Sequence, residues 1–152
     1  MGNIFHDDFR DFLQALNNNR VRYLLVGGYA VIFYGYARTT GDMDLWVDCT
    51  AENYALLENA FNEFQMPVFD MTLDRFLQTD QVDVFRFGRK PVAIDIMTQM
   101  AHLDFETCFA KKQLFNDDGL ILPVVHLDEL KVAKTKAGRS KDLDDLEHLP
   151  AS

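Results

Sequence analysis

Leu25-Val26-Gly27-Gly28-Tyr29-Ala30 lies where two apolar runs meet. The first run extends from Val21 to Val26, and the second extends from Tyr29 to Ala37. The first run predicts a buried strand and the second a buried helix, so the glycine pair predicts an abrupt turn from strand to helix. Such a turn leaves backbone N–H groups free to face an anion, and glycine lets a phosphate approach the backbone closely. A tight turn without any ligand is the simpler interpretation of a glycine pair taken by itself.

Two carboxylates follow in Arg38-Thr39-Thr40-Gly41-Asp42-Met43-Asp44, where a second strand is expected over residues 43–48. Side chains alternate along a strand, so Asp42 and Asp44 should project from one face, roughly 7 Å apart. Like charges at this spacing repel unless a cation lies between them. Mg²⁺ prefers carboxylates together with substrate phosphates and waters, so the pair indicates a metal–triphosphate site. The alternative is a solvated strand end in which the spacing arose by chance.

A third carboxylate, Asp95, lies within Val92-Ala93-Ile94-Asp95-Ile96-Met97, a run that otherwise predicts a buried strand. An ionised carboxylate in such a strand is costly unless it is paired or bound to a metal. If this strand neighbours the one that carries Asp44, three carboxylates converge, as in two-metal sites for in-line phosphoryl transfer. A structural ion pair of Asp95 with Arg86 or Arg22 is the alternative.

The rest of the chain predicts helices and strands joined by both hairpins and crossovers. Helices are expected over about 5–18, from Thr50 as N-cap to about 65, and over about 127–137 and 143–149, with a hinge at Gly138. Strands are expected at 82–87 and 91–97, as a hairpin around 88–90, and a turn at 116–119 precedes an apolar run at 120–125. We therefore predict an α/β (α+β) fold with a small mixed sheet flanked by helices. Residues 1–152 should form a single domain with a short helical tail at about 127–149.

Composition excludes several classes of protein. The 152 residues are 48% hydrophobic and 26% charged, which is ordinary for a globular domain and excludes bulk disorder. The net charge of −9 disfavours a general nucleic-acid coat, although a local basic patch stays open. Cys49 and Cys108 form no zinc or disulfide pattern. The sequence shows no apolar run of about 20 residues and no signal peptide at its start, so we expect a cytoplasmic protein that does not enter membranes.

Basic residues gather near the end of this acidic chain. A triphosphate or an RNA backbone facing the site would explain such a concentration. The candidate phosphate contacts are Lys134, Arg139 and Lys141. The alternative is a solvated helix face balanced by nearby acids, including an i,i+4 pair of Lys141 with Asp145.

Taken together, these residues resemble a known family. Leu25–Ala30 with Arg38-x-Thr40-x-Asp42-x-Asp44 is similar to the signature of the nucleotidyltransferase fold of the DNA polymerase β superfamily. It looks closest to small bacterial members, including nucleotidyltransferase-like toxins of abortive-infection (type IV) toxin–antitoxin systems. Ile94-Asp95-Ile96 resembles the third-carboxylate motif, and residues 130–146 resemble the Lys/Arg…Lys-Asp-x-x-Asp-Leu element of the same members. The resemblance covers about residues 21–149.

The resemblance implies an enzyme that moves NMP from an NTP, such as ATP, to a hydroxyl acceptor and releases pyrophosphate. It implies that Asp42, Asp44 and Asp95 are catalytic ligands of two Mg²⁺ ions, for which Mn²⁺ could substitute. The residues expected to bind the nucleotide and its phosphates are Gly27, Gly28, Arg38, Thr40, Lys134, Arg139 and Lys141.

The acceptor stays open between tRNA, a protein side chain and a small molecule. In larger relatives a C-terminal helical domain helps to form the base or acceptor pocket, whereas only two short helices are expected here. A partner chain or a second copy of this chain, as a homodimer, could complete the pocket. The alternative function is a non-catalytic nucleotide- or partner-binding module of a toxin–antitoxin type system. The three carboxylates favour the enzyme, and the short tail favours the module.

Overall fold

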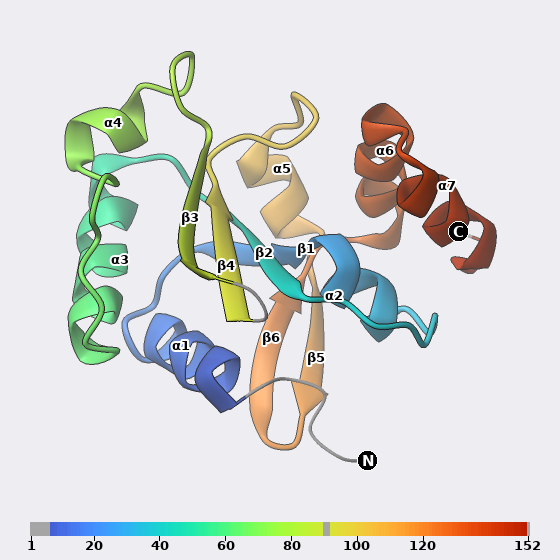
Figure 1. The fold of residues 1–152 in the computed structure, drawn as a ribbon, viewed down its shortest axis with the longest axis horizontal. Helices are drawn as coiled ribbons and strands as arrows, with labels where there is room; N and C mark the ends of the chain where they lie inside the picture. The colour runs from blue at the N-terminus through green and yellow to red at the C-terminus, as the bar shows by residue number, and fades with distance from the viewer. Residues whose placement is uncertain (1–6, 90–91, 152) are drawn as a thin grey trace.

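A mixed six-stranded sheet forms the centre of the computed structural model, which describes residues 7–89 and 92–151 (Figure 1). The strand order is β3-β4-β2-β1-β6-β5. Parallel pairs join β1 to β6 and β2 to β4, and the other neighbours are antiparallel. The strands are β1 (Tyr23–Val26), β2 (Asp42–Val47), β3 (Val84–Arg89), β4 (Val92–Met97), β5 (Gln113–Asp117) and β6 (Leu120–Val124). The predicted mixed sheet flanked by helices is confirmed.

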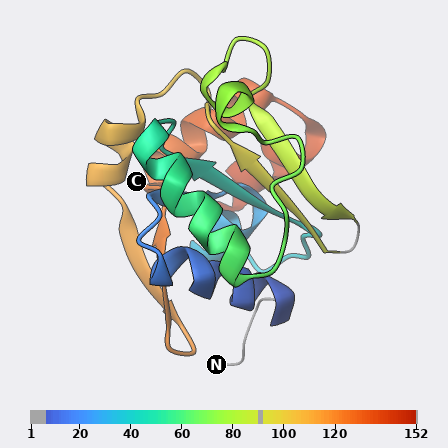
Figure 2. The ribbon, with the colours of Figure 1, turned by 90° about the vertical axis from the view of Figure 1, so that its left-hand side faces the viewer.

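Helices lie on both sides of this sheet. They are α1 (Asp7–Asn18), α2 (Gly27–Phe33), α3 (Ala51–Glu63), α4 (Leu73–Leu77), α5 (Phe105–Ala110), α6 (Leu127–Ala137) and α7 (Ser140–His148). Figure 2 shows α1 and α3 together in front of the sheet, and Figure 1 shows α6 and α7 at the other end of the molecule. Within the described residues, none of the helices has both the length and the apolar character needed to span a bilayer.

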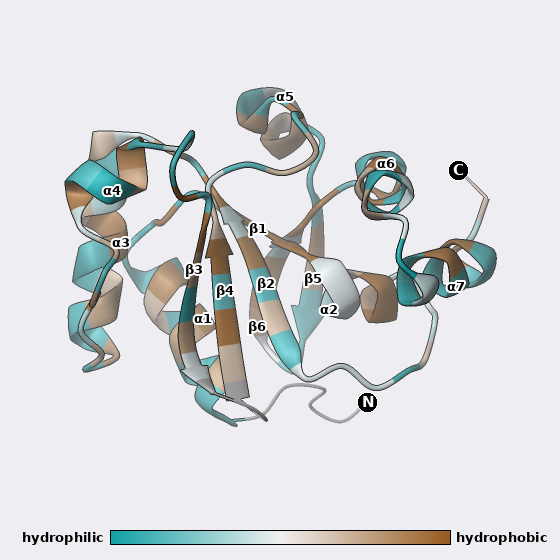
Figure 3. Cartoon of the chain, turned by 45° about the horizontal axis from the view of Figure 1, so that its top comes forward, coloured by the Kyte–Doolittle hydropathy of each residue, from teal (hydrophilic) through white to brown (hydrophobic). Residues whose placement is uncertain are grey.

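The packing of α1 and α3 determines which way the side chains of β2 point. Phe12 of α1 packs edge-on against Phe61 of α3, with ring centroids 5.4 Å apart, and Phe61 packs against Phe87 of β3 at 4.8 Å. Met43, Leu45 and Val47 of β2 are fully buried in the same core. Because side chains alternate along a strand, Asp42 and Asp44 must project from the opposite face. Figure 3 shows the resulting alternation of hydrophilic and hydrophobic residues along β2.

Several predicted boundaries are confirmed, and others shift. Thr50 caps α3 by accepting a hydrogen bond from the Asn53 N–H at 3.1 Å, and Gly138 is the left-handed hinge between α6 and α7, with φ of 63°. Helix α2 starts at Gly27 and ends at Phe33, earlier than the predicted 29–37. Helix α7 starts at Ser140, before the predicted start at residue 143. Strand β3 runs two residues later than predicted, and part of the predicted turn at 88–90 and the start of the first helix lie outside the described residues.

Three elements were not predicted from the sequence. Helices α4 and α5 have 5 and 6 residues, too few for an apolar period to appear. Each is capped by a side chain instead, because Thr72 accepts from the Arg75 N–H and Asp104 from the Thr107 N–H. Strand β5 pairs with β6 around the turn that the sequence did indicate.

The two glycines at the start of α2 allow residues 38–44, which we call the second motif, to pack directly on the turn. Gly27 has a φ of +68°, and a Cβ there would overlap with Asp44 Oδ2. A Cβ at Gly28 would lie 2.5 Å from Thr40 Oγ1 and 2.9 Å from Arg38 Nη2. The glycine turn and the residues from Arg38 to Asp44 therefore form one packed unit, which explains why glycine is required at both positions.

Gly27→Ala should cost about 2–4 kcal/mol of stability, because it combines a left-handed backbone with overlap at Asp44. The matched control is Gly41→Ala in the same segment, where a Cβ would meet nothing within 4 Å. The control should be neutral or slightly stabilising, because alanine reduces the entropy of the unfolded chain. Urea midpoints of both variants measure the difference, and equal losses of stability would contradict this account of the turn.

Candidate functional site

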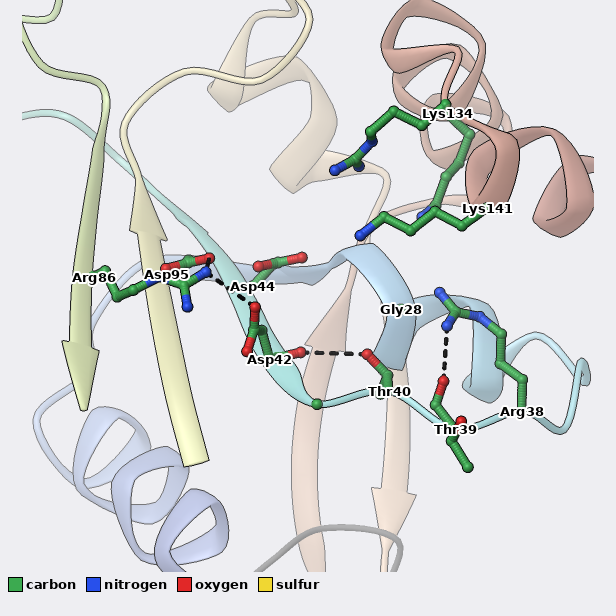
Figure 4. Close-up of a pocket in the computed structure, with 12 residues that line it drawn as sticks. Gly28, Arg38, Thr39, Thr40, Asp42, Asp44, Arg86, Asp95, Lys134 and Lys141 are labelled. Carbon is green, nitrogen blue, oxygen red and sulfur yellow. Dashed lines mark hydrogen bonds and ion pairs between the residues drawn. The ribbon is translucent and has the colours of Figure 1, made fainter. Parts of the chain in front are cut away.

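Three carboxylates meet on neighbouring strands, on the face of the sheet that α1 and α3 leave open. In the parallel pair of β2 and β4, Asp44 lies directly opposite Asp95, and Asp42 lies opposite Ala93. Figure 4 shows the three carboxylates at one pocket. The strand that carries Asp95 does neighbour the strand that carries Asp44, so the predicted convergence is present.

Arg86 of β3 lies opposite Asp95 in the hairpin register and bridges two of the carboxylates. Its Nη2 donates to Asp95 Oδ2 at 2.9 Å and to Asp42 Oδ2 at 3.0 Å. The hydrogen bond to Asp42 and the charges of both acids raise the pKa of this guanidinium above its ordinary value. The alternative predicted for Asp95, an ion pair with Arg86, is therefore present within the carboxylate cluster. The other partner considered, Arg22, pairs with Asp48 and Glu106 instead.

The cluster carries more negative charge than Arg86 can balance. Burial raises the pKa of Asp44 to about 6, with further contributions in the same direction from the charges of Asp95 and Asp42. Asp42 Oδ1 and Asp95 Oδ1 are buried and accept no hydrogen bond from the described residues. Buried carboxylate oxygens without donors are costly, so the cluster would gain stability from a bound cation.

The described residues do not form a closed metal cage around the carboxylates. Within residues 7–89 and 92–151, no three metal-ligating side chains are already arranged around one ion position. Mg²⁺ usually keeps several waters and binds through one or two carboxylates plus substrate phosphates. The buried oxygens of Asp42 and Asp95 that lack donors are suitable ligands for such a site.

Cations line the opposite wall of this pocket, which has a volume of about 630 Å³. Lys141 extends from α7 toward the carboxylates (Figure 4), and no ion pair engages it in the described part of the chain. Arg139 is 61% exposed and bonds to Asp142 Oδ2 at 2.7 Å. Gly28 and Thr40 form the floor between the two walls. The pocket thus has one acidic wall and one basic wall.

Two further predicted phosphate contacts line the pocket but are held in ion pairs. Lys134 Nζ is buried and lies 3.2 Å from Asp142 Oδ1 and 2.9 Å from Asp145 Oδ2. Arg38 Nε lies 2.8 Å from Asp145 Oδ1, so Asp145 joins α6, α7 and the second motif. The pairing of Asp145 with Lys141, weighed from the sequence, gives way to these contacts.

Asp142 and Asp145, which are 0% and 1% exposed, anchor the basic wall, and this role was not predicted from the sequence. Their spacing of three residues on a helix was the available signal, because it places both carboxylates on one face. Arg86 was predicted only as a possible partner of Asp95, and its second contact, with Asp42, was not predicted.

Comparisons with known proteins support the fold. No protein-family model matches the sequence, and no curated protein matches it. Among solved structures, the chain resembles the crystal structure of a "putative nucleotidyltransferase (TM1012)" from Thermotoga maritima, with a TM-score of 0.57 and 16% sequence identity. The match covers 91% of this chain and 88% of that chain. At this identity the likeness shows the fold alone, so the chain has a nucleotidyltransferase-like α/β fold.

The raised pKa of Asp44 predicts a pH dependence of stability in the absence of metal. With a pKa of about 6 in the folded protein against the usual 3.8, the folded state binds this proton more tightly than the unfolded chain. The stabilisation is therefore fully present at low pH and is lost as pH rises through about 6. Asp44→Asn, which cannot ionise, should gain stability relative to the wild type between about pH 4 and pH 7, on the order of 1–3 kcal/mol.

Urea unfolding at several pH values measures this gain. Asp83 is an exposed residue directly before β3, so Asp83→Asn removes the same charge away from the cluster and serves as the control. A stability difference between Asp44→Asn and the wild type that does not change with pH would show that Asp44 is not strained by its surroundings.

Proposed function

We propose that this protein is a metal-dependent nucleotidyltransferase that transfers NMP from an NTP to a hydroxyl acceptor and releases pyrophosphate. The register of β2 on β4 carries the proposal, because it sets Asp44 beside Asp95 and adds Asp42 on the same face. The basic wall opposite the carboxylates and the nucleotidyltransferase-like fold support it.

The triphosphate would lie between the glycine turn and the basic wall. Gly28 lines the pocket at the start of α2, and Thr40 offers a hydroxyl beside it. Lys141 and Arg139 are exposed enough to meet phosphate oxygens. The ion pairs of Arg38 and Lys134 assign these two residues a positioning role, because they hold α7 and its cations over the pocket.

Asp42 and Asp44 would hold two Mg²⁺ ions, one of them shared with Asp95, and Mn²⁺ could take their place. When bound, these ions would neutralise charge on the phosphates and on the attacking oxygen. Asp95 lies on β4, on the side of Asp44 away from the glycine turn, so the acceptor hydroxyl would enter from the β3–β4 side.

The transfer forms one bond and breaks one bond. The acceptor oxygen bonds to the α-phosphorus, the bond from this phosphorus to the bridging oxygen breaks, and pyrophosphate leaves. The proton of the acceptor hydroxyl passes to the carboxylate of Asp95. Catalysis of this kind consists mainly of positioning the reacting groups and neutralising the charge on the phosphates. The register of β2 on β4 would fix the positions of the carboxylates that hold the ions.

The acceptor is proposed only as a hydroxyl on RNA, on a protein or on a small molecule, as in the toxin-like nucleotidyltransferases that the motifs resemble. A partner chain or a second copy of this chain could complete its pocket beside the basic wall. These alternatives differ in the product that carries the transferred nucleotide, so one labelling experiment distinguishes them.

Incubation with each α-³²P-labelled NTP, Mg²⁺ and a cell extract should transfer label to an RNA, protein or small-molecule band. Asp44→Asn and Asp95→Asn should each lower the rate by on the order of 100-fold or more, because each removes stabilisation of the transition state. Asp83→Asn, outside the pocket, is the control and should retain the rate.

Three results would contradict the proposal. Transfer of label from γ-labelled but not from α-labelled NTP would indicate a kinase. Equal rates for the wild type and Asp44→Asn would place the activity elsewhere. Nucleotide binding without transfer from any of the NTPs would favour the non-catalytic binding module.

A further inference from the structure

Arg86 holds together two carboxylates that come from different strands. Its Nη2 alone donates to Asp95 Oδ2 on β4 and to Asp42 Oδ2 on β2, at 2.9 and 3.0 Å. Figure 4 shows the guanidinium beside these two acids, on the side of the pocket away from α6 and α7. These are the carboxylates whose other oxygens, Oδ1 in each case, are buried without a donor.

Other cations at the pocket act on the carboxylates from a greater distance. Lys134 uses its ammonium on Asp142 and Asp145. Lys141 extends toward Asp44 from the basic wall without forming an ion pair in the described part of the chain. In the described residues, Arg86 is the cation in hydrogen-bond contact with the cluster, and it neutralises part of the charge on Asp42 and Asp95.

A metal ion and Arg86 would compete for the same two carboxylates. The ion needs oxygens of Asp42 and Asp95, and its positive charge repels a guanidinium held on those carboxylates. The side chain of Arg86 is 47% exposed, whereas those of Asp42 and Asp95 are 26% and 14% exposed. The arginine can therefore leave for solvent, and the carboxylates remain in place.

We propose that Arg86 is a displaceable counter-ion, which holds the carboxylates together in the empty protein and yields them to a metal–nucleotide complex. This proposal rests on the proposed function. Once released, the guanidinium stays tethered at the rim of the pocket, where its planar fork can pair with phosphate oxygens. A metal ion alone displaces Arg86 from both carboxylates and offers it no new partner. A metal ion bound with a nucleotide offers Arg86 the phosphate oxygens instead. The protein should therefore discriminate against free metal ions.

Binding of Mn²⁺ alone, followed by the electron paramagnetic resonance signal of the free aquo ion, tests this competition without any turnover. Arg86→Gln keeps hydrogen-bond donors but removes the charge, so it should bind Mn²⁺ at least tenfold more tightly than the wild type. Arg86→Lys keeps the charge but reaches one carboxylate at a time, so its affinity should lie between them. Arg75→Ala removes an exposed charge on α4 and should bind like the wild type.

The affinity for the preformed complex of Mn²⁺ with a non-hydrolysable NTP analogue should differ less between Arg86→Gln and the wild type, because the wild-type arginine then gains the phosphates. Equal or weaker Mn²⁺ binding by Arg86→Gln would overturn the proposal while leaving the proposed function in place. If Arg86→Gln fails to fold, as judged by circular dichroism, Arg86→Lys takes its place. Mn²⁺ binding by Arg86→Lys that is equal to or weaker than that of the wild type would then overturn the proposal. If no variant binds either Mn²⁺ alone or its complex with the analogue, both proposals are overturned.

Discussion

Repulsion between carboxylates on two parallel strands is the constraint around which this structure is built. Asp44 and Asp95 face each other across β2 and β4, with Asp42 nearby on the same face. Burial makes the charge on Asp44 costly, as its raised pKa of about 6 indicates. Arg86 offsets part of the charge from one side, and Lys141 extends toward it from the other. An arrangement this costly persists only because packing elsewhere holds it in place.

The hydrophobic core supplies that packing. Met43 and Leu45 are buried on the opposite face of β2, so a register slip by one residue would turn Asp42 and Asp44 into the core and expose the apolar residues. On the other wall, Asp145 is buried between Lys134 and Arg38 and ties the tail helices to the second motif. The acidic and basic walls are therefore positioned by separate parts of the fold, and the glycine turn lies between them.

Local patterns explain why much of this architecture could be predicted from the sequence. The glycine pair and the Asp42–Asp44 spacing are local signals, and both lie where they were expected. Asp95 lies beside Asp42 and Asp44 only because β4 is the neighbour of β2. The sequence allowed this strand order but could not establish it. The second contact of Arg86 depends on the hairpin register, and the burial of Lys134 depends on packing between α6 and α7. Tertiary contacts of this kind leave no periodic trace in a single sequence.

We propose that Asp42, Asp44 and Asp95 together form a metal–nucleotide site. Crystals grown with Mn²⁺ and a non-hydrolysable NTP analogue, measured for anomalous scattering, would locate both the ion and the nucleotide. We expect an anomalous peak bonded to the carboxylates of Asp42 and Asp44, with the triphosphate between Gly28 and Lys141 and with Arg86 released from Asp42. Nucleotide bound at another surface, or bound here with no anomalous peak and with Arg86 still bridging Asp42 and Asp95, would contradict it.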